Sequence, residues 1–351
     1  MPRRILLVAL AALVLAAAAC SSGTSGSGTS AKSGLAAAMA SVSGTGSAAQ
    51  YFEYGDLATM RRLGILRPTP DGSAAPIDHR WIGVVGLGGV DLITYSKVLH
   101  GLIDLNVLTG GAAIAIGNPP NDATRIDGAQ DRKAVLAKLT ALGAKPRSFG
   151  GTAGLSFGPD NSIDLSGKLS DPKYGTLGLH LRQIAVTDNT FAVSANGATL
   201  EKVLAAGDRS LLDTPHFQGL ADCLGDVVGA IVLADPAIDT RAALVGIGVR
   251  TPVSAGGTVD DVLCILPKPG DQDSVHQSLT QRLAPHATDP ISHQPLSTYV
   301  SKTAVDNVGG LVRAVLTLKS TAPAGYLIEG VERNLASYWD GSCASVPSGQ
   351  C

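Results

Sequence analysis

The sequence predicts an α+β fold, with mostly antiparallel sheets packed against helices, and two related α+β units are one arrangement that fits it. Two kinds of pattern carry this prediction. Short apolar runs that end at Gly, Pro, Asn or Asp are typical of strands joined by turns, as in Arg182–Ala195. Other segments place apolar residues three and four positions apart, which is one helix face, as in Asp131–Leu142. Apolar residues make up 45% of the chain, enough for a large core.

The N-terminal segment Met1–Ala19 has the layout of a secretory signal peptide. Two arginines precede an uninterrupted apolar run, which is shorter than the ~20 residues of a membrane-spanning helix. The ending Ala17-Ala18-Ala19-Cys20 resembles the lipobox of bacterial lipoproteins, although Ala17 stands where Leu is usual. The resemblance implies that Cys20 is lipidated and becomes the first residue of the mature protein. Ordinary cleavage after Ala19, with Cys20 incidental, is the alternative.

Residues 20–50 are predicted to form the lipidated cysteine and a Gly/Ser-rich linker. Ser21–Ser30 reads SSGTSGSGTS, and the bias persists to about Ser47. Such a segment buries little apolar surface and spans about 25–30 Å on average. A lipid on Cys20 would therefore hold the folded part near the outer face of the cell membrane. The folded part is predicted to comprise a first α+β unit, 51–210, and a second, 211–351.

The prediction of two related units comes from a repeated order of elements. A strand, a proline-containing loop, an acidic cap and a helix occur at Ala112–Leu142 and again at Val262–Leu283. A duplicated unit would produce this order. The alternative is that two such runs occur by chance in any α+β protein.

Individual elements follow from caps, turns and spacing. Asp56 is expected to cap a short helix, and Asp131 to begin the clearest one, which stops before Gly143. Further helices are expected at 91–105, around 200–204, from Pro215 to Gly225, from Asp273 or Ser274 to Leu283, and from Pro323 onward. Strands are expected at 112–117, 148–157, 227–234, 244–250, 262–266 and 311–318, besides the hairpin at 182–195.

Charge and composition exclude some classes of partner. Removing the two signal-peptide arginines from the 27 basic residues leaves 25 against 29 acidic ones, a net charge of −4. The longest later basic run is Arg61-Arg62, so nucleic acid is not an expected partner. No cysteine spacing is that of a zinc site. Gly86–Asp91 imitates a dinucleotide fingerprint, but Asp91 occupies the third glycine position. We therefore expect neither a metal nor a cofactor.

Four cysteines lie beyond Cys20. An even number in an exported chain suggests two disulfides, for which three connectivities exist. We favour Cys223–Cys264, which would join a helix end to an apolar strand, and Cys343–Cys351, which would close the C-terminal tail. Buried free thiols at positions 223 and 264 are the alternative.

One motif raises the question of catalysis. Residues 154–158 read GLSFG and match G-x-S-x-G, the nucleophile elbow of exported esterases. That chemistry needs a strand before Ser156 and a helix directly after it. Here residues 159–162, PDNS, predict a turn instead. A secreted serine hydrolase using Ser156, with one of His180, His216, His276, His286 or His293 as its base, is therefore an alternative rather than the leading interpretation.

The run Ile184–Val232 resembles a pattern in uncharacterised envelope proteins of actinobacteria. A hairpin is followed by a short helix ending at Leu204-Ala205-Ala206, then Ser210-Leu211, then D-x-P-x-F at 213–217 and a strand. The resemblance implies no catalytic residue. We expect an exported, membrane-anchored lipoprotein with a non-catalytic binding or scaffolding role in the cell envelope. A carrier of a hydrophobic ligand is the second interpretation, alongside the serine hydrolase.

Overall fold

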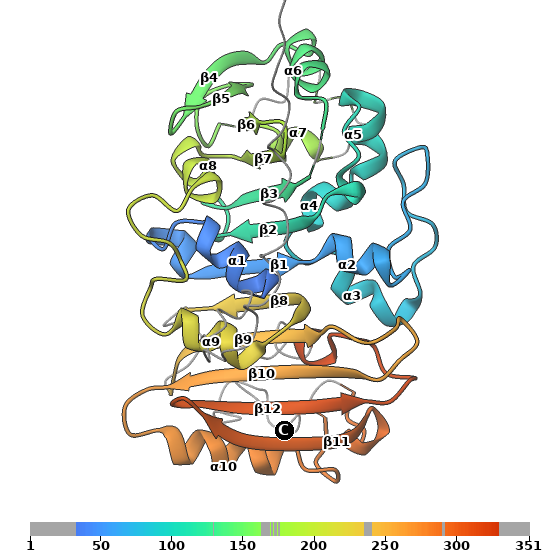
Figure 1. The fold of residues 1–351 in the computed structure, drawn as a ribbon, viewed down its shortest axis with the longest axis vertical. Coiled ribbons are helices and arrows are strands. Elements are labelled where there is room, and N and C mark those ends of the chain that lie inside the picture. The colour runs from blue at the N-terminus through green and yellow to red at the C-terminus, as the bar shows by residue number, and fades with distance from the viewer. Residues whose placement is uncertain are drawn as a thin grey trace, which may run out of the picture. The chain divides into compact units, whose positions relative to one another are not determined.

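A computed structural model describes residues 33–329, apart from 129, 163–168, 170, 172, 173, 175, 235–240, 290 and 291 (Figure 1). The predicted signal peptide, Cys20, Cys343 and Cys351 lie outside the described residues, as does the predicted helix beyond Glu329.

The described strands form one antiparallel sheet in the order β11-β12-β10-β9-β8-β1-β2-β3-β7-β6-β5-β4. The first half-sheet comprises β1 (Tyr51–Gly55), β2 (Ala112–Ile116), β3 (Ala123–Asp127), β4 (Lys145–Phe149), β5 (Thr152–Ser156), β6 (Gln183–Val186) and β7 (Thr190–Ser194). The second half-sheet comprises β8 (Val227–Leu233), β9 (Ala242–Arg250), β10 (Val259–Pro267), β11 (Val300–Val308) and β12 (Leu311–Leu318). Together with the helices, this confirms the predicted α+β class.

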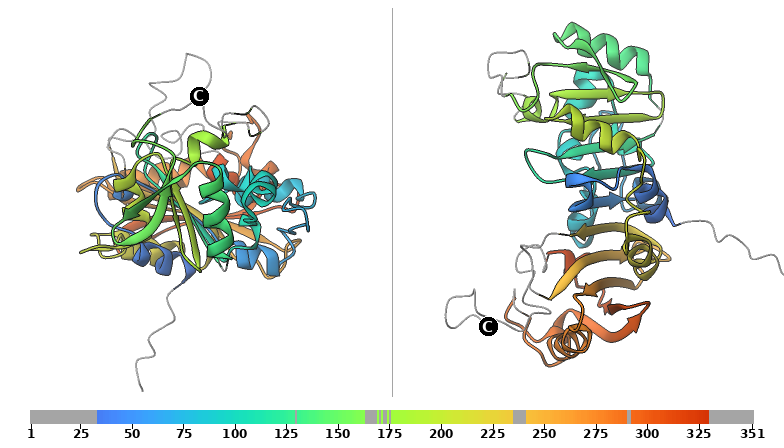
Figure 2. Two further views of the ribbon diagram at one scale, coloured as in Figure 1. Left: turned by 90° about the horizontal axis from the view of Figure 1, so that it is seen from above. Right: turned by 90° about the vertical axis from the view of Figure 1, so that its left-hand side faces the viewer.

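Helices cover both faces of the sheet, as Figures 1 and 2 show. Residues of α1 (Gly34–Ser41), α8 (Gly197–Leu204) and α9 (Phe217–Leu224) belong to one apolar core. A second core receives residues of α2 (Leu57–Arg62), α3 (Ile82–Val85), α4 (Val90–Ile93), α5 (Ser96–Ile103), α6 (Arg132–Ala141), α7 (Leu177–His180) and α10 (Gln272–Arg282). Side chains of a strand alternate between the two cores, which is why β8 reads as a continuous apolar run.

Two predicted helix starts are confirmed by their caps. Asp56 Oδ1 accepts a hydrogen bond from the Thr59 amide at 2.8 Å, and Asp131 Oδ1 accepts one from the Ala134 amide at 2.9 Å. Two other starts were predicted wrongly. Helix α9 begins at Phe217 rather than Pro215, because the chain turns through His216 at φ 74°. Helix α10 begins at Gln272, ahead of the expected cap at Asp273 or Ser274.

The predicted linker is wrong over residues 33–50, which are folded. Ser33 Oγ accepts a hydrogen bond from the Ala36 amide at 3.2 Å and caps α1. Leu35, Met39 and Val42 are completely buried, and the Val42 carbonyl accepts a bond from the Leu211 amide. The Gly- and Ser-rich composition hides these residues in the sequence: Leu35 and Met39 are four positions apart on one face of α1, and Val42 follows the helix in an extended conformation. Residues 20–32 lie outside the described part.

Three further elements differ from expectation. The strand predicted at 148–157 is the hairpin β4–β5, turned by two glycines with positive φ, Gly150 and Gly151. The helix predicted at 91–105 is divided into α4 and α5. Strands β1, β3 and β11 were not predicted. Arg125 interrupts the apolar pattern of β3, and β11 is an edge strand with mostly polar, exposed residues.

The two half-sheets meet at the pairing of β1 with β8. Phe52 lies opposite Val232 and Tyr54 opposite Ala230, so the hydrogen-bond ladder continues across the seam. The segments 51–210 and 211–351, predicted as separate units, thus contribute to one sheet.

Candidate functional site

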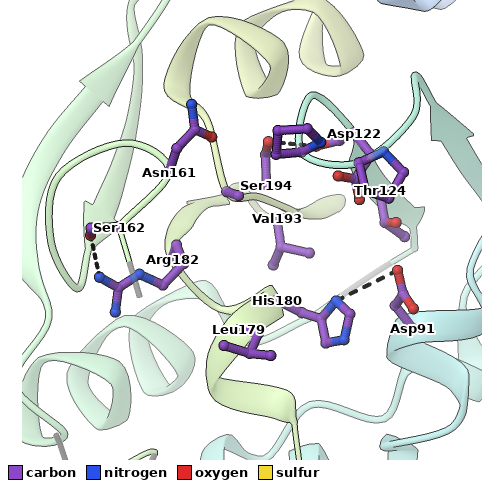
Figure 3. Close-up of a pocket in the computed structure, with 13 residues that line it drawn as sticks. Asp91, Asp122, Thr124, Asn161, Ser162, Leu179, His180, Arg182, Val193 and Ser194 are labelled. Atoms are coloured by element: carbon purple, nitrogen blue, oxygen red, sulfur yellow. Dashed lines mark hydrogen bonds and ion pairs between the residues drawn. The ribbon is translucent and has the colours of Figure 1, made fainter. Parts of the chain in front are cut away.

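A pocket of about 400 Å3 lies at the first half-sheet (Figure 3). Its walls come from five places: α4, the loop between β2 and β3 together with the start of β3, the segment after β5, the end of α7, and strand β7 with its flanking residues. Short strands bring these chain reversals close to one another. The pocket combines polar groups from these reversals with Thr124 of β3 and Ser194 of β7.

Arg182 forms one side of the pocket, directly before β6. Arg182 is 5% exposed, and its Nη2 donates a hydrogen bond to Ser162 Oγ. Nε is buried and has no hydrogen-bond partner, and among the described residues no carboxylate pairs with this guanidinium. An arginine carries five N–H donors and stays charged, so burial with one neutral partner is costly. Within the described residues, the Arg182 guanidinium thus has one hydrogen-bond partner, the Ser162 hydroxyl.

The opposite side of the pocket is acidic (Figure 3). Asp91 lies on α4, Asp122 precedes β3, and His180 ends α7. His180 Nδ1 is 3.5 Å from Asp91 Oδ2. Burial raises the pKa of the Asp122 carboxyl, the charge of Asp91 raises it further, and His180 acts in the opposite direction. Arg182 lies on the other side of the pocket (Figure 3), and within the described residues no ion pair joins it to Asp91 or Asp122.

Buried leucines and apolar walls hold this arrangement in place. Leu177 and Leu181 are completely buried and anchor α7, which fixes the positions of His180 and Arg182 on either side of Leu181. Val193 is a buried wall, and Leu179 is 42% exposed beside the pocket. Pro119 and Pro120, joined by a cis peptide bond, line the pocket from the β2–β3 loop. The pocket thus has two charged sides with apolar surface between them.

The polar wall residue Ser194 has a structural role. Its Oγ donates to the Asp122 carbonyl at 2.6 Å and accepts a bond from the Asn196 amide at 3.0 Å. With both functions engaged, this hydroxyl ties the end of β7 to the start of β3. It is not a free nucleophile beside His180.

Ser156, the residue of the G-x-S-x-G motif, lies at the end of β5. Its Oγ donates to the Gly158 carbonyl at 2.6 Å and accepts from the Gly158 amide at 3.2 Å. Bends and a turn follow the strand through Asn161, where a nucleophile elbow would have a helix. Ser156 does not line the pocket, and no histidine bonds to it within the described part. The strand–serine–helix geometry that the hydrolase alternative needs is not formed there.

The predicted disulfide between Cys223 and Cys264 is confirmed. It joins α9 to β10 with a Cα–Cα distance of 6.3 Å, and both residues are buried. The second predicted bond, Cys343–Cys351, and the lipidation site Cys20 fall outside the described residues and stay predictions. Within the described part of the chain, no group of three His, Cys, Asp or Glu side chains could hold a metal ion.

The sequence does not predict this pocket. In the sequence His180 is one of five candidate histidines, Asp91 is the residue that breaks a dinucleotide motif, and no pattern marks Asp122 or Arg182 as site residues. Arg182 stands immediately before a strand whose residues are all buried. A charged residue at such a position is the one local signal that could have pointed to a site.

Comparisons with known proteins add little. No family model matches the chain, and no curated protein matches it. A solved structure titled "Structure of crystal form IV of TP0453" matches with a TM-score of 0.41 and 8% identity, over 85% of this chain and 98% of that one. A match at this level carries no argument about function. Searched over its described residues, the structure contains no helix long and apolar enough to cross a membrane.

Proposed function

We propose that this protein is an exported lipoprotein, tethered to the outer face of the cell membrane through a lipid on Cys20, that binds a small solute carrying an acidic group. Binding without turnover is the proposed activity. The observation that carries it is Arg182: a nearly buried guanidinium at a pocket of about 400 Å3, with Ser162 Oγ as its hydrogen-bond partner. A carboxylate or phosphate would supply the paired acceptors that a guanidinium prefers.

The charged groups and the volume of the pocket favour a polar ligand over the hydrophobic ligand of the alternative interpretation. An apolar molecule would leave the Arg182 guanidinium and the Asp91 carboxylate without new partners while removing water from them, which costs free energy. The pocket volume lies in the lower part of the range for small-molecule sites, about 300–1,000 Å3. A solute of metabolite size therefore suits it better than a long acyl chain.

Binding assays on the mature chain test the ligand part of the proposal. The panel is inorganic phosphate, alkyl phosphates, short carboxylic acids and amino acids, measured by thermal shift and calorimetry. We expect saturable binding by at least one class, weakened about tenfold or more in Arg182→Gln, because a charge-assisted bidentate contact is lost. Arg182→Lys should retain part of the affinity. Arg209→Gln, at an exposed loop arginine, is the matched control. Failure of every compound to bind, or equal binding by Arg182→Gln, would refute it.

Cell fractionation tests the anchor part. Cys20→Ser should move the protein from the membrane fraction to the medium and abolish labelling by a fatty-acid analogue, because the thiol is the proposed acylation site. A Cys20→Ser variant that stays in the membrane fraction would overturn the lipoprotein assignment. That result would not affect the proposal that the pocket binds an acidic solute, so the two parts of the proposal can fail separately.

A further inference from the structure

The charges around the pocket are unequal. Asp91 and Asp122 contribute two carboxyl groups on one side, while Arg182 contributes one guanidinium on the other (Figure 3). His180 stands against Asp91, with Nδ1 at 3.5 Å from Oδ2. Arg182 stays charged at any pH, whereas an imidazole offsets a carboxylate only when it is protonated. A simple anion would bind the guanidinium but would also bring a negative charge close to two carboxylates.

We infer that the ligand is a small zwitterion, with an acidic group at Arg182 and an ammonium group at Asp91 and Asp122. This inference rests on the proposed function and names the ligand class for the same pocket. An ammonium group is a strongly hydrated cation with three donors, and carboxylates are its usual partners in proteins. Placed at the acidic side, it would offset the repulsion that a simple anion meets there.

The surface between the two charged sides fits the spacer of such a molecule. Val193 is buried in this wall, Leu179 is partly exposed, and Pro119 and Pro120 face the pocket from the β2–β3 loop. A few methylene groups can lie against these residues without losing hydrogen bonds. The shared chemistry is thus an acid and an ammonium joined by a short aliphatic chain. An ω-amino acid or phosphoethanolamine has this form, free in solution or, for the latter, as a lipid headgroup.

Matched ligand pairs test the inference by calorimetry on the mature chain. Phosphoethanolamine is compared with ethyl phosphate, and β-alanine with propionate, because each pair differs by the ammonium group. We expect about tenfold or more tighter binding of the ammonium-bearing member of at least one pair. Asp122→Asn and Asp91→Asn should each reduce that preference toward unity. Asp208→Asn, at an exposed loop position, should leave it unchanged.

A vesicle assay separates the two sources of the headgroup. The Cys20→Ser variant, which lacks the proposed lipid, is mixed with phosphatidylglycerol vesicles that contain or lack phosphatidylethanolamine. Arg182-dependent recruitment by phosphatidylethanolamine supports a lipid headgroup, and binding of the soluble compounds alone supports a free solute. Arg182→Gln serves in both arms, and Arg182→Met, which also removes the charge, replaces it if the glutamine variant does not fold.

The outcomes distinguish the inference from the proposed function beneath it. If both members of each pair bind equally and Arg182→Gln abolishes their binding, the anion site stands and the zwitterion is refuted. If the aspartate variants keep the full preference for ammonium, the assignment of Asp91 and Asp122 is refuted. If no acidic compound and no vesicle binds, the inference and the proposed function fail together.

Discussion

Both half-sheets are built from antiparallel strand pairs, and they differ in the length of their strands. Strands β1–β7 have four or five residues, whereas β8–β12 have seven to nine. The second half-sheet also contains the disulfide, which holds α9 on β10. Short strands reverse often, and their loops and short helices bring polar side chains together at the pocket. Long strands keep the backbone paired and bury apolar side chains. The difference assigns proposed ligand binding to the first half-sheet and cross-linked stability to the second.

A helix precedes the hairpin at each edge of the sheet. Helix α6 leads into the β4–β5 hairpin at one edge of the sheet, and α10 leads toward the β11–β12 hairpin at the other. The hairpins join the sheet differently. Strand β12 pairs with β10, which precedes its helix, whereas β5 pairs with β6, which follows later in the chain. The order helix–hairpin recurs in both halves with different onward pairing.

The largest expected effect separates stability from binding. The double variant Cys223→Ala/Cys264→Ala should lose about 4 kcal/mol of unfolding free energy, because the bond closes a loop with a sequence separation of 41. Urea unfolding measures the loss. Ligand affinity at the pocket, measured well below the unfolding transition, should stay unchanged. If the folded double variant loses as much ligand affinity as Arg182→Gln does, the disulfide in the second half-sheet also supports binding in the first, and the proposed division between stability and binding is wrong.

The next effect concerns pH and a carboxyl in the second half-sheet. Asp261 is completely buried and accepts bonds from the amides of Gly325 and Leu327 at 3.1 and 2.9 Å. Burial raises its pKa to about 7, against about 3.9 in an unfolded chain. Between these values the folded state binds more protons than the unfolded state. The contribution of Asp261 to stability therefore falls as pH rises from about 4 to about 7, by at most about 4 kcal/mol.

Asp261→Asn isolates this contribution. Exposed carboxylates act in the opposite direction: the pKa of Asp160 is lowered by Arg147 and that of Asp306 by Arg313, so their contributions are lost as pH falls. The informative quantity is thus the difference in urea midpoint between wild type and variant. We expect wild type to lose stability relative to the variant as pH rises from about 4 to about 7. A difference that is flat with pH would mean that Asp261 ionises normally in the folded protein.

The smallest expected effect compares the two helices directly. Asp131 caps α6 with a side-chain hydrogen bond, whereas Asp271 at the start of α10 makes no such bond. Asp131→Ala should cost about 1 kcal/mol, and Asp271→Ala clearly less, because only the first substitution removes a cap. Chemical denaturation of the two single variants measures both. Equal losses would indicate that charge near the helix end, rather than the hydrogen bond, is what matters.

Elements whose signals are local could be predicted from the sequence alone. Asp56 and Asp131 satisfy amides at the start of their own helices, and Gly225 follows α9 directly, so a short window of sequence contains the whole cause. The turn at Asp188-Asn189 likewise places β6 beside β7. The Cys223–Cys264 pairing is favoured by the sequence, because a helix end and an apolar strand are both recognisable, but the fold selects it over the other connectivities across a separation of 41 residues.

Features that depend on contacts between distant segments could not be predicted from the sequence and are visible in the folded chain. Leu35 and Met39 look like part of a linker until the chain around Leu211 and α9 covers them. Strand β3 holds a buried arginine, Arg125, whose Nη1 donates to the Val203 carbonyl of α8, and no local pattern announces such a partner. The pocket needs residues from positions 91 to 195. Its charges become significant through burial and mutual proximity, which are properties of the folded chain rather than of any stretch of sequence.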